Sequence, residues 1–206
     1  MLAYIGFIDR VSTAIGKAFG WFILIMTFGT SYEVFVRYAL NNPTTWAYDL
    51  SYNMYGALFV MAGAYTLSRN AHVRGDVIYR LWPPRAQAGI DLLLFIIFFF
   101  PGVMALTLAG YRYAGESWRY QEVSVYSPTD IPIFPLKTLI PVAGATLLLQ
   151  GLAEVFRCII CLRTGAWPQR AQDVEELETA ILHEREFIAE HEAETASLAA
   201  GQEQKS

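Results

Sequence analysis

The sequence predicts an all-α membrane protein with four transmembrane helices, followed by a soluble amphipathic helix. The 206-residue chain is 54% hydrophobic and only 17% charged, whereas soluble domains are about 25% charged. It contains apolar stretches long enough to cross a bilayer as helices, which takes about 20 residues. Its charge is divided unevenly: residues 1–170 carry 9 acidic and 13 basic side chains, and residues 171–206 carry 10 acidic and 2 basic ones. A membrane-embedded body with an acidic tail explains both regions.

The chain begins with a predicted amphipathic lead-in over residues 1–17, which we expect to lie at the membrane interface. The first span is predicted over about residues 18–36. No A-x-A-like cleavage site follows it, so we expect it to stay as an anchor. Glu33 and Arg37 are four residues apart, and we expect them to pair on one helix face near the membrane edge.

A polar turn separates the first two spans. Asn41-Asn42-Pro43 breaks the helix, and Thr44 or Thr45 is predicted to cap the next one. Trp46 and Asp49 then form a Trp-x-x-acid signature, in which Trp46 suits the aromatic belt of a membrane interface.

The second span is predicted over about residues 50–67, an uncharged apolar run that measures roughly 27 Å as a helix. Small residues recur on one of its faces at spacings of three and four, among them Gly56 and Gly63. Such a face lets another helix approach closely in lipid, so we interpret it as a helix-contact surface.

A basic loop over residues 68–86 precedes the third span, which is predicted over about residues 92–111. Pro101-Gly102 is expected to kink that span. Gly102, Ala105 and Ala109 offer a second small-residue face. A long aromatic loop is predicted over residues 112–133.

The fourth span is predicted over about residues 136–162. It carries a polar stripe in which Glu154 is expected to pair with Arg157. Cys158 and Cys161 lack the context of a redox or zinc motif, so we interpret them as small packing residues. Residues 171–199 predict an acidic cytoplasmic helix with near-heptad apolar spacing, and residues 200–206 a disordered tail.

The basic residues predict the orientation. With a cytoplasmic N-terminus, nine Lys or Arg side chains fall on the cytoplasmic side and four on the opposite side. Positive charge favours the cytoplasmic side, so we expect both termini there. The four on the other side are Arg37, Arg112, Arg119 and Lys137.

Catalysis and cofactor binding are not expected from this chain. An enzyme needs convergent acid, base or nucleophile groups, and the predicted spans offer almost none. His72 is the one histidine of the membrane body, which excludes a bis-His haem held by this chain alone. A local bond between His72 and Asp76 is favoured over a metal site, which needs more ligands. The basic loop adjoins two spans, so membrane lipids, and not nucleic acid, are its expected partners.

Several elements around the second span recur together in a known family. In chain order they are Arg37-Tyr38, Pro43, Trp46-x-x-Asp49, the small-residue span ending at Gly63-Ala64-Tyr65, and His72-Val73-Arg74-Gly75-Asp76. Over about residues 10–162 they resemble the small membrane subunit of tripartite ATP-independent periplasmic (TRAP) transporters, the DctQ-type proteins. That family commonly has Glu where this chain has Asp49, and the acidic extension after Gln169 is not part of the resemblance.

The resemblance implies a multi-pass subunit of the bacterial inner membrane. A periplasmic substrate-binding protein would capture an organic acid, and a large membrane subunit would move it inward, driven by sodium. The small subunit would scaffold the large one. The residues expected to serve contact and lipid anchoring are Arg37, Trp46, Asp49, Gly56, Gly63, His72, Arg74 and Asp76. For Trp46 and Arg74, an ordinary interfacial role is an equal alternative.

Two other functions stay open at this point. The chain alternatively serves as the membrane anchor of a redox enzyme complex, in which case the purified chain would show haem absorbance. A stand-alone channel or exporter would move substrate in liposomes without a partner.

Overall fold

The computed structural model describes residues 1–71, 79, 81–125, 130–168, 185, 187 and 188. It divides the chain into two units, Met1–Gln169 and Arg170–Ser206. In the second unit the described residues 185, 187 and 188 are helical and exposed, and the rest of the predicted acidic helix and tail lies outside the described residues. The elements of the first unit are α1 (Leu2–Ala39), α2 (Ala47–Ser68), α4 (Pro84–Leu94), the π-helical segment η1 (Phe95–Phe99), α5 (Phe100–Tyr120) and α6 (Phe134–Thr164).

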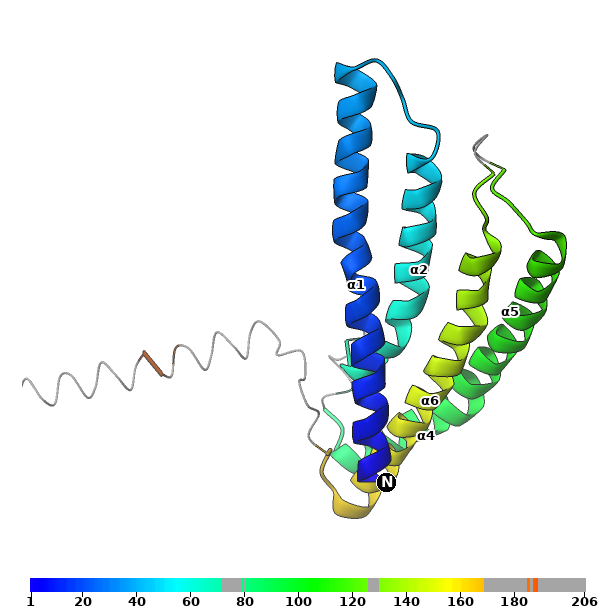
Figure 1. Cartoon of the computed structure of the whole chain (residues 1–206). Helices are drawn as coiled ribbons and strands as arrows, with labels where there is room; N and C mark the ends of the chain where they lie inside the picture. The colour runs from blue at the N-terminus through cyan, green and yellow to red at the C-terminus, as the bar shows by residue number, and fades with distance from the viewer. Residues whose placement is uncertain (72–78, 80, 126–129, 169–184, 186, 189–206) are drawn as a thin grey trace, which may run out of the picture. The chain divides into compact units, whose positions relative to one another are not determined.

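The predicted all-α class is confirmed for the described residues, whose only β pairing is an isolated bridge between Val123 and Pro132. Within the first unit the long helices form two antiparallel pairs, α1 with α2 and α5 with α6 (Figure 1). Helix α6 also packs against α2 and α1, so it joins the two pairs. The short helix α4 packs on α6 near its C-terminal end.

In the described part of the chain, three helical segments are long and apolar enough to cross a membrane: Leu2–Ala39, Pro84–Tyr120 and Phe134–Thr164. They contain the predicted first, third and fourth spans. Helix α2 is not among them, because tyrosines, Asn53 and Asp49 lower its mean hydropathy. The four-span arrangement and the orientation of the termini therefore stay predictions.

Helix α1 runs unbroken through residues 17 and 18, so the predicted lead-in over residues 1–17 and the first span belong to one helix. The position of the lead-in at the membrane interface stays a prediction. The first turns of α1 are held by packing. Ile5 and Ile8 are buried in a cluster with Ala153 of α6. This packing on α6 accounts for the continuation of α1 through its first turns.

The third span contains a π-helical turn just before Pro101 and ends later than predicted. The amide of Phe100 donates to the carbonyl of Phe95, and this wide turn comes directly before Pro101, which lacks an amide and crowds the preceding turn. Helix α5 continues past residue 111 to Tyr120 and ends at Gln121, whose φ is 48°. Residues 112–120, which the sequence assigns to the loop, are therefore helical, and they hold no proline that would end the helix.

The contact between α5 and α6 uses a different small-residue face from the predicted one. Gly102, Ala105 and Ala109 are exposed. Gly110, Ala114 and Ser117 are buried instead, at spacings of four and three. Both sets of small residues fit the helical period. The set that faces α6 contains Gly110, which leaves room for Ile140 and Pro141.

The interpretation of the cysteines as packing residues is confirmed. Cys158 and Cys161 are buried against Ala88 of α4. The Cys161 thiol contacts the carbonyl oxygen of Pro84 at 3.5 Å.

Candidate functional site

The turn between α1 and α2 is organised by Glu33. Arg37 donates to one carboxylate oxygen from Nη2 at 2.5 Å and from Nε at 2.9 Å, so the predicted pair is confirmed. The other oxygen accepts from the backbone amide of Thr44 at 3.0 Å and from its hydroxyl. The prediction that Thr44 or Thr45 caps α2 is wrong, since Trp46 is the N-cap and makes no side-chain cap bond. Thr44 is used to close the turn onto α1.

Trp46 lies at the same end of the helix pair. Its ring stacks on that of Tyr32 of α1, with centroids 6.3 Å apart, and the side chain stays 38% exposed. The Arg37 side chain is 50% exposed. Both predicted site residues are therefore partly exposed. The Trp46 ring is held by Tyr32 of α1, and the Arg37 side chain is held by Glu33 of the same helix.

Asp49 is buried, with 1% of its surface exposed. Its Oδ1 accepts a hydrogen bond of 2.7 Å from the hydroxyl of Ser124, in the loop between α5 and α6. That loop is closed on itself, because the Ser124 amide donates to Ile131 and the Ile133 amide donates to Glu122. Asp49 therefore connects α2 to the loop that contains Ser124, 75 residues further along the chain. The spacing of residues within one helix does not predict such a distant contact.

We expect Asp49→Ala to lower the free energy of unfolding by about 1–3 kcal/mol, because it leaves the buried Ser124 hydroxyl without its acceptor. Asp49→Asn keeps an acceptor oxygen and is expected to lose less. Denaturant unfolding in detergent measures both, and hydrogen exchange at the Ser124 amide reports loosening of the loop. Equal stability of the alanine variant and the wild type would contradict this role.

Glu122 sits where that loop leaves α5. One carboxylate oxygen accepts from the Ser117 hydroxyl at 2.7 Å and from the ammonium of Lys137 on α6. Lys137 also lies over the ring of Tyr113, 4.0 Å from its centroid. The hydrogen bond from Lys137 and, after it, that from Ser117 hold the pKa of Glu122 below its usual range. This group thus joins α5, the loop and α6.

This shift makes the contact depend on pH. A carboxylate whose pKa is lower in the folded state stabilises the fold above its unfolded pKa, and the contribution is lost as pH falls through the folded pKa. We expect the difference in melting temperature between the wild type and Glu122→Gln to be constant above about pH 5 and to shrink below it. Melting curves of both proteins from neutral to acidic pH test this. A difference that grows towards acid pH would contradict it.

Five polar side chains join α1 to α6, four of them buried and Asp9 half-buried, and we call them the α1–α6 polar cluster: Asp9, Ser12, Gln150, Glu154 and Arg157. The Arg157 guanidinium donates to Glu154 from Nη1 and to Asp9 from Nη2. The predicted pair of Glu154 and Arg157 is confirmed. Arg157 is 1% exposed, so it is not one of the surface charges that orient the chain.

Gln150 completes this cluster. Its Nε2 donates to Asp9 at 3.0 Å and to Glu154 at 3.3 Å, and its Oε1 accepts from the Ser12 hydroxyl at 2.8 Å. Asp9 and Ser12 were not among the residues that the sequence singled out. Both residues lie on the side of α1 that packs on α6. The sequence could have indicated this only if residues 1–17 had been read as part of one continuous helix.

The predicted contact face of α2 is used within this chain. A Cβ added to Gly56 would meet the Leu136 side chain at 3.4 Å, and one added to Gly63 would meet Leu147 at 3.5 Å. Both leucines belong to α6. The close helix approach that these glycines indicated is therefore present, and the helix that approaches is α6.

His72, Arg74 and Asp76, the remaining predicted site residues, lie outside the described residues, as does the proposed bond between His72 and Asp76. Among the described residues, no group of three or more His, Cys, Asp or Glu side chains is arranged to hold a metal ion. The polar groups described above form hydrogen bonds and ion pairs that hold the helices together, so their role is structural.

A protein-family model described as "Tripartite ATP-independent periplasmic transporters, DctQ component" matches residues 26–161. The matched range runs from the middle of α1 to near the end of α6. Comparison with curated proteins gives no significant match.

Proposed function

Because the chain belongs to the DctQ family of tripartite ATP-independent periplasmic transporter components, we propose that it is the scaffold subunit of a sodium-driven uptake system for an organic acid. Its proposed partners are a large membrane subunit, which moves the substrate, and a periplasmic binding protein, which delivers it. The proposed location is the bacterial inner membrane. The observation that carries this proposal is the family match over residues 26–161.

The internal contacts support a scaffolding role. A transport domain that moves needs a frame that does not, and frames are built from helices with fixed spacing. Here buried hydrogen bonds connect α1 to α6 and α2 to the loop between α5 and α6. Buried hydrogen bonds between elements help to fix these elements relative to one another.

Arg37 and Trp46 are proposed to anchor the helix pair at the periplasmic interface and to contact the large subunit. His72, Arg74 and Asp76 are proposed to do the same on the cytoplasmic side. For Asp49, Gly56 and Gly63 the contacts described above support an indirect role, in which they shape the frame that the partner meets.

Reconstitution in liposomes tests the function. The chain, the large subunit and the binding protein are combined with an inward sodium gradient, and uptake of the acid that the binding protein retains is measured. We expect uptake only with all three proteins and the gradient. Flux through the chain alone would favour the channel alternative, and full uptake without the chain would contradict a scaffolding role. The family match favours the transporter component over the redox anchor.

A further inference from the structure

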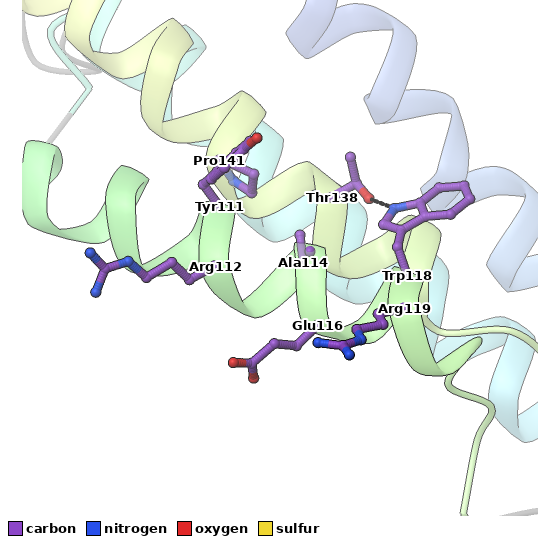
Figure 2. A pocket seen from close by; sticks show the side chains of 9 residues that line it. Tyr111, Arg112, Ala114, Glu116, Trp118, Arg119, Thr138 and Pro141 are labelled. Atoms are coloured by element: carbon purple, nitrogen blue, oxygen red, sulfur yellow. Dashed lines mark hydrogen bonds between the residues drawn. The ribbon is translucent and has the colours of Figure 1, made fainter.

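A hollow of about 580 Å³ opens between α5 and α6 near the C-terminal end of α5. Figure 2 shows the side chains that line it. None of the contacts that fix the helices needs this space, and the scaffolding role does not account for it.

One wall of the hollow is rigid. The indole of Trp118 donates to the Thr138 hydroxyl at 2.7 Å, a bond drawn in Figure 2, and its ring packs on Phe134 with centroids 4.4 Å apart. The floor is made of small or apolar groups, including Ala114, Gly115 and Pro141. A Cβ added to Gly115 would have no atom within 4 Å, so the space beside this glycine is open. A slender apolar chain fits such a surface.

Basic side chains border the apolar surface. Arg112 and Arg119 are seven residues apart on α5, so they lie on the same side of the helix about 10 Å apart along its axis. Both are exposed, and in the described part of the chain neither forms an ion pair. Glu116 lies between them, which leaves the rim with a net charge of +1. A rim of this charge favours an anion, which a guanidinium binds well.

The neighbouring aromatic residues indicate the depth of the hollow in the membrane. The long apolar stretch of η1 and α5 ends near Tyr111, and Tyr111, Trp118 and Tyr120 are 73%, 48% and 75% exposed. Exposed tyrosine and tryptophan at the end of a span mark the headgroup level of a bilayer. Phospholipid phosphates lie at this level, with their acyl chains directed towards the apolar part of α5.

We propose that this hollow binds one anionic phospholipid, with its phosphate held by Arg112 and Arg119, its glycerol backbone beside Gly115, and an acyl chain running along α5 towards Tyr111. The basic rim and the apolar groove recognise different parts of the lipid. The arginines select for negative charge, and the open groove between α5 and α6 selects for a chain. This inference requires the membrane placement of α5 and does not depend on which substrate the transporter carries.

Native mass spectrometry of the detergent-purified full chain tests the charge requirement, with phosphatidylglycerol, phosphatidylcholine and glycerol phosphate added separately. We expect retention of phosphatidylglycerol to exceed that of phosphatidylcholine at least tenfold, and glycerol phosphate not to be retained. The double variant Arg112→Gln/Arg119→Gln should lose this preference. Arg163→Gln, which removes an exposed arginine from the other end of α6, should keep it.

A second variant tests the groove with both arginines in place. Gly115→Leu fills the open space and is expected to lower phosphatidylglycerol retention severalfold. Gly102→Leu is the matched control, because Gly102 is an open glycine of the same helix outside the hollow, and it should bind as the wild type. Melting curves confirm that all variants are folded.

Three outcomes would overturn the proposal. Equal retention of the anionic and zwitterionic lipids would remove the role of the arginines. Unchanged binding in the double variant would place the lipid elsewhere. Retention of glycerol phosphate as strong as that of the lipid would make the site a phosphate site without a chain groove.

Discussion

Replacing Arg157 with methionine is expected to lower the free energy of unfolding by about 3–5 kcal/mol. The side chain is 1% exposed and donates to two carboxylates, Asp9 of α1 and Glu154 of α6. Methionine preserves the apolar volume but removes the only cation of the α1–α6 polar cluster. The buried carboxylate of Glu154 and the half-buried one of Asp9 would then lie near each other without a counter-charge, and their repulsion acts on the contact between α1 and α6.

The loss of stability depends on the two negative charges that remain, so neutralising both carboxylates should restore most of it. In the triple variant Asp9→Asn/Glu154→Gln/Arg157→Met the cluster is neutral, and we expect most of the lost stability to return. Arg163→Met is the matched control, since Arg163 is an exposed arginine of the same helix. Denaturant unfolding in detergent measures all three. A triple variant no more stable than the single one would contradict the electrostatic account.

Gly110→Leu is expected to separate α5 from α6 and to destabilise the chain by about 1–3 kcal/mol or more. A Cβ at this position would lie 2.7 Å from Cγ2 of Ile140 and 3.3 Å from the backbone nitrogen of Pro141. Ile140 has a stiff branched side chain and the Pro141 nitrogen belongs to the backbone, so neither gives way easily. The helix axes must therefore move apart.

Gly102→Leu on the same helix controls for the change in residue type, because an added Cβ there meets nothing within 4 Å. Melting temperature in detergent compares the two variants. In addition, paired cysteines placed across α5 and α6 would crosslink more slowly in Gly110→Leu than in the control. Identical melting and crosslinking of the two variants would rule out Gly110 as a point where α5 and α6 must stay close.

The sequence predicts local features of this fold well. Long apolar runs predict the helices, and helical spacing predicts the pairs Glu33–Arg37 and Glu154–Arg157, since both partners lie on one helix. Contacts between distant segments were out of reach. Asp9 lies 148 residues from Arg157, and Asp49 lies 75 residues from Ser124. No period along the chain carries that information, because it depends on which helices become neighbours.

The same limit explains two errors, one on a helix face and one at a helix cap. On α5 two small-residue tracks have the same period, and only the shape of α6 around Pro141 decides between them. On α2 a small-residue face does predict close approach, but the sequence does not tell whether the approaching helix belongs to this chain. Thr44 was assigned to a cap because capping is a local rule, while the carboxylate that binds it lies on α1.

The α1–α6 polar cluster also sets an order of events during synthesis. Asp9 leaves the ribosome long before Arg157, which is 148 residues further along the chain. At about 5–20 residues per second, the first helix waits on the order of ten seconds for the cation that neutralises its carboxylate. During that interval the N-terminal turns must be kept in water or against the insertion machinery. The contacts of the α1–α6 polar cluster thus form late, because α1 can bond to α6 only after α6 has been synthesised.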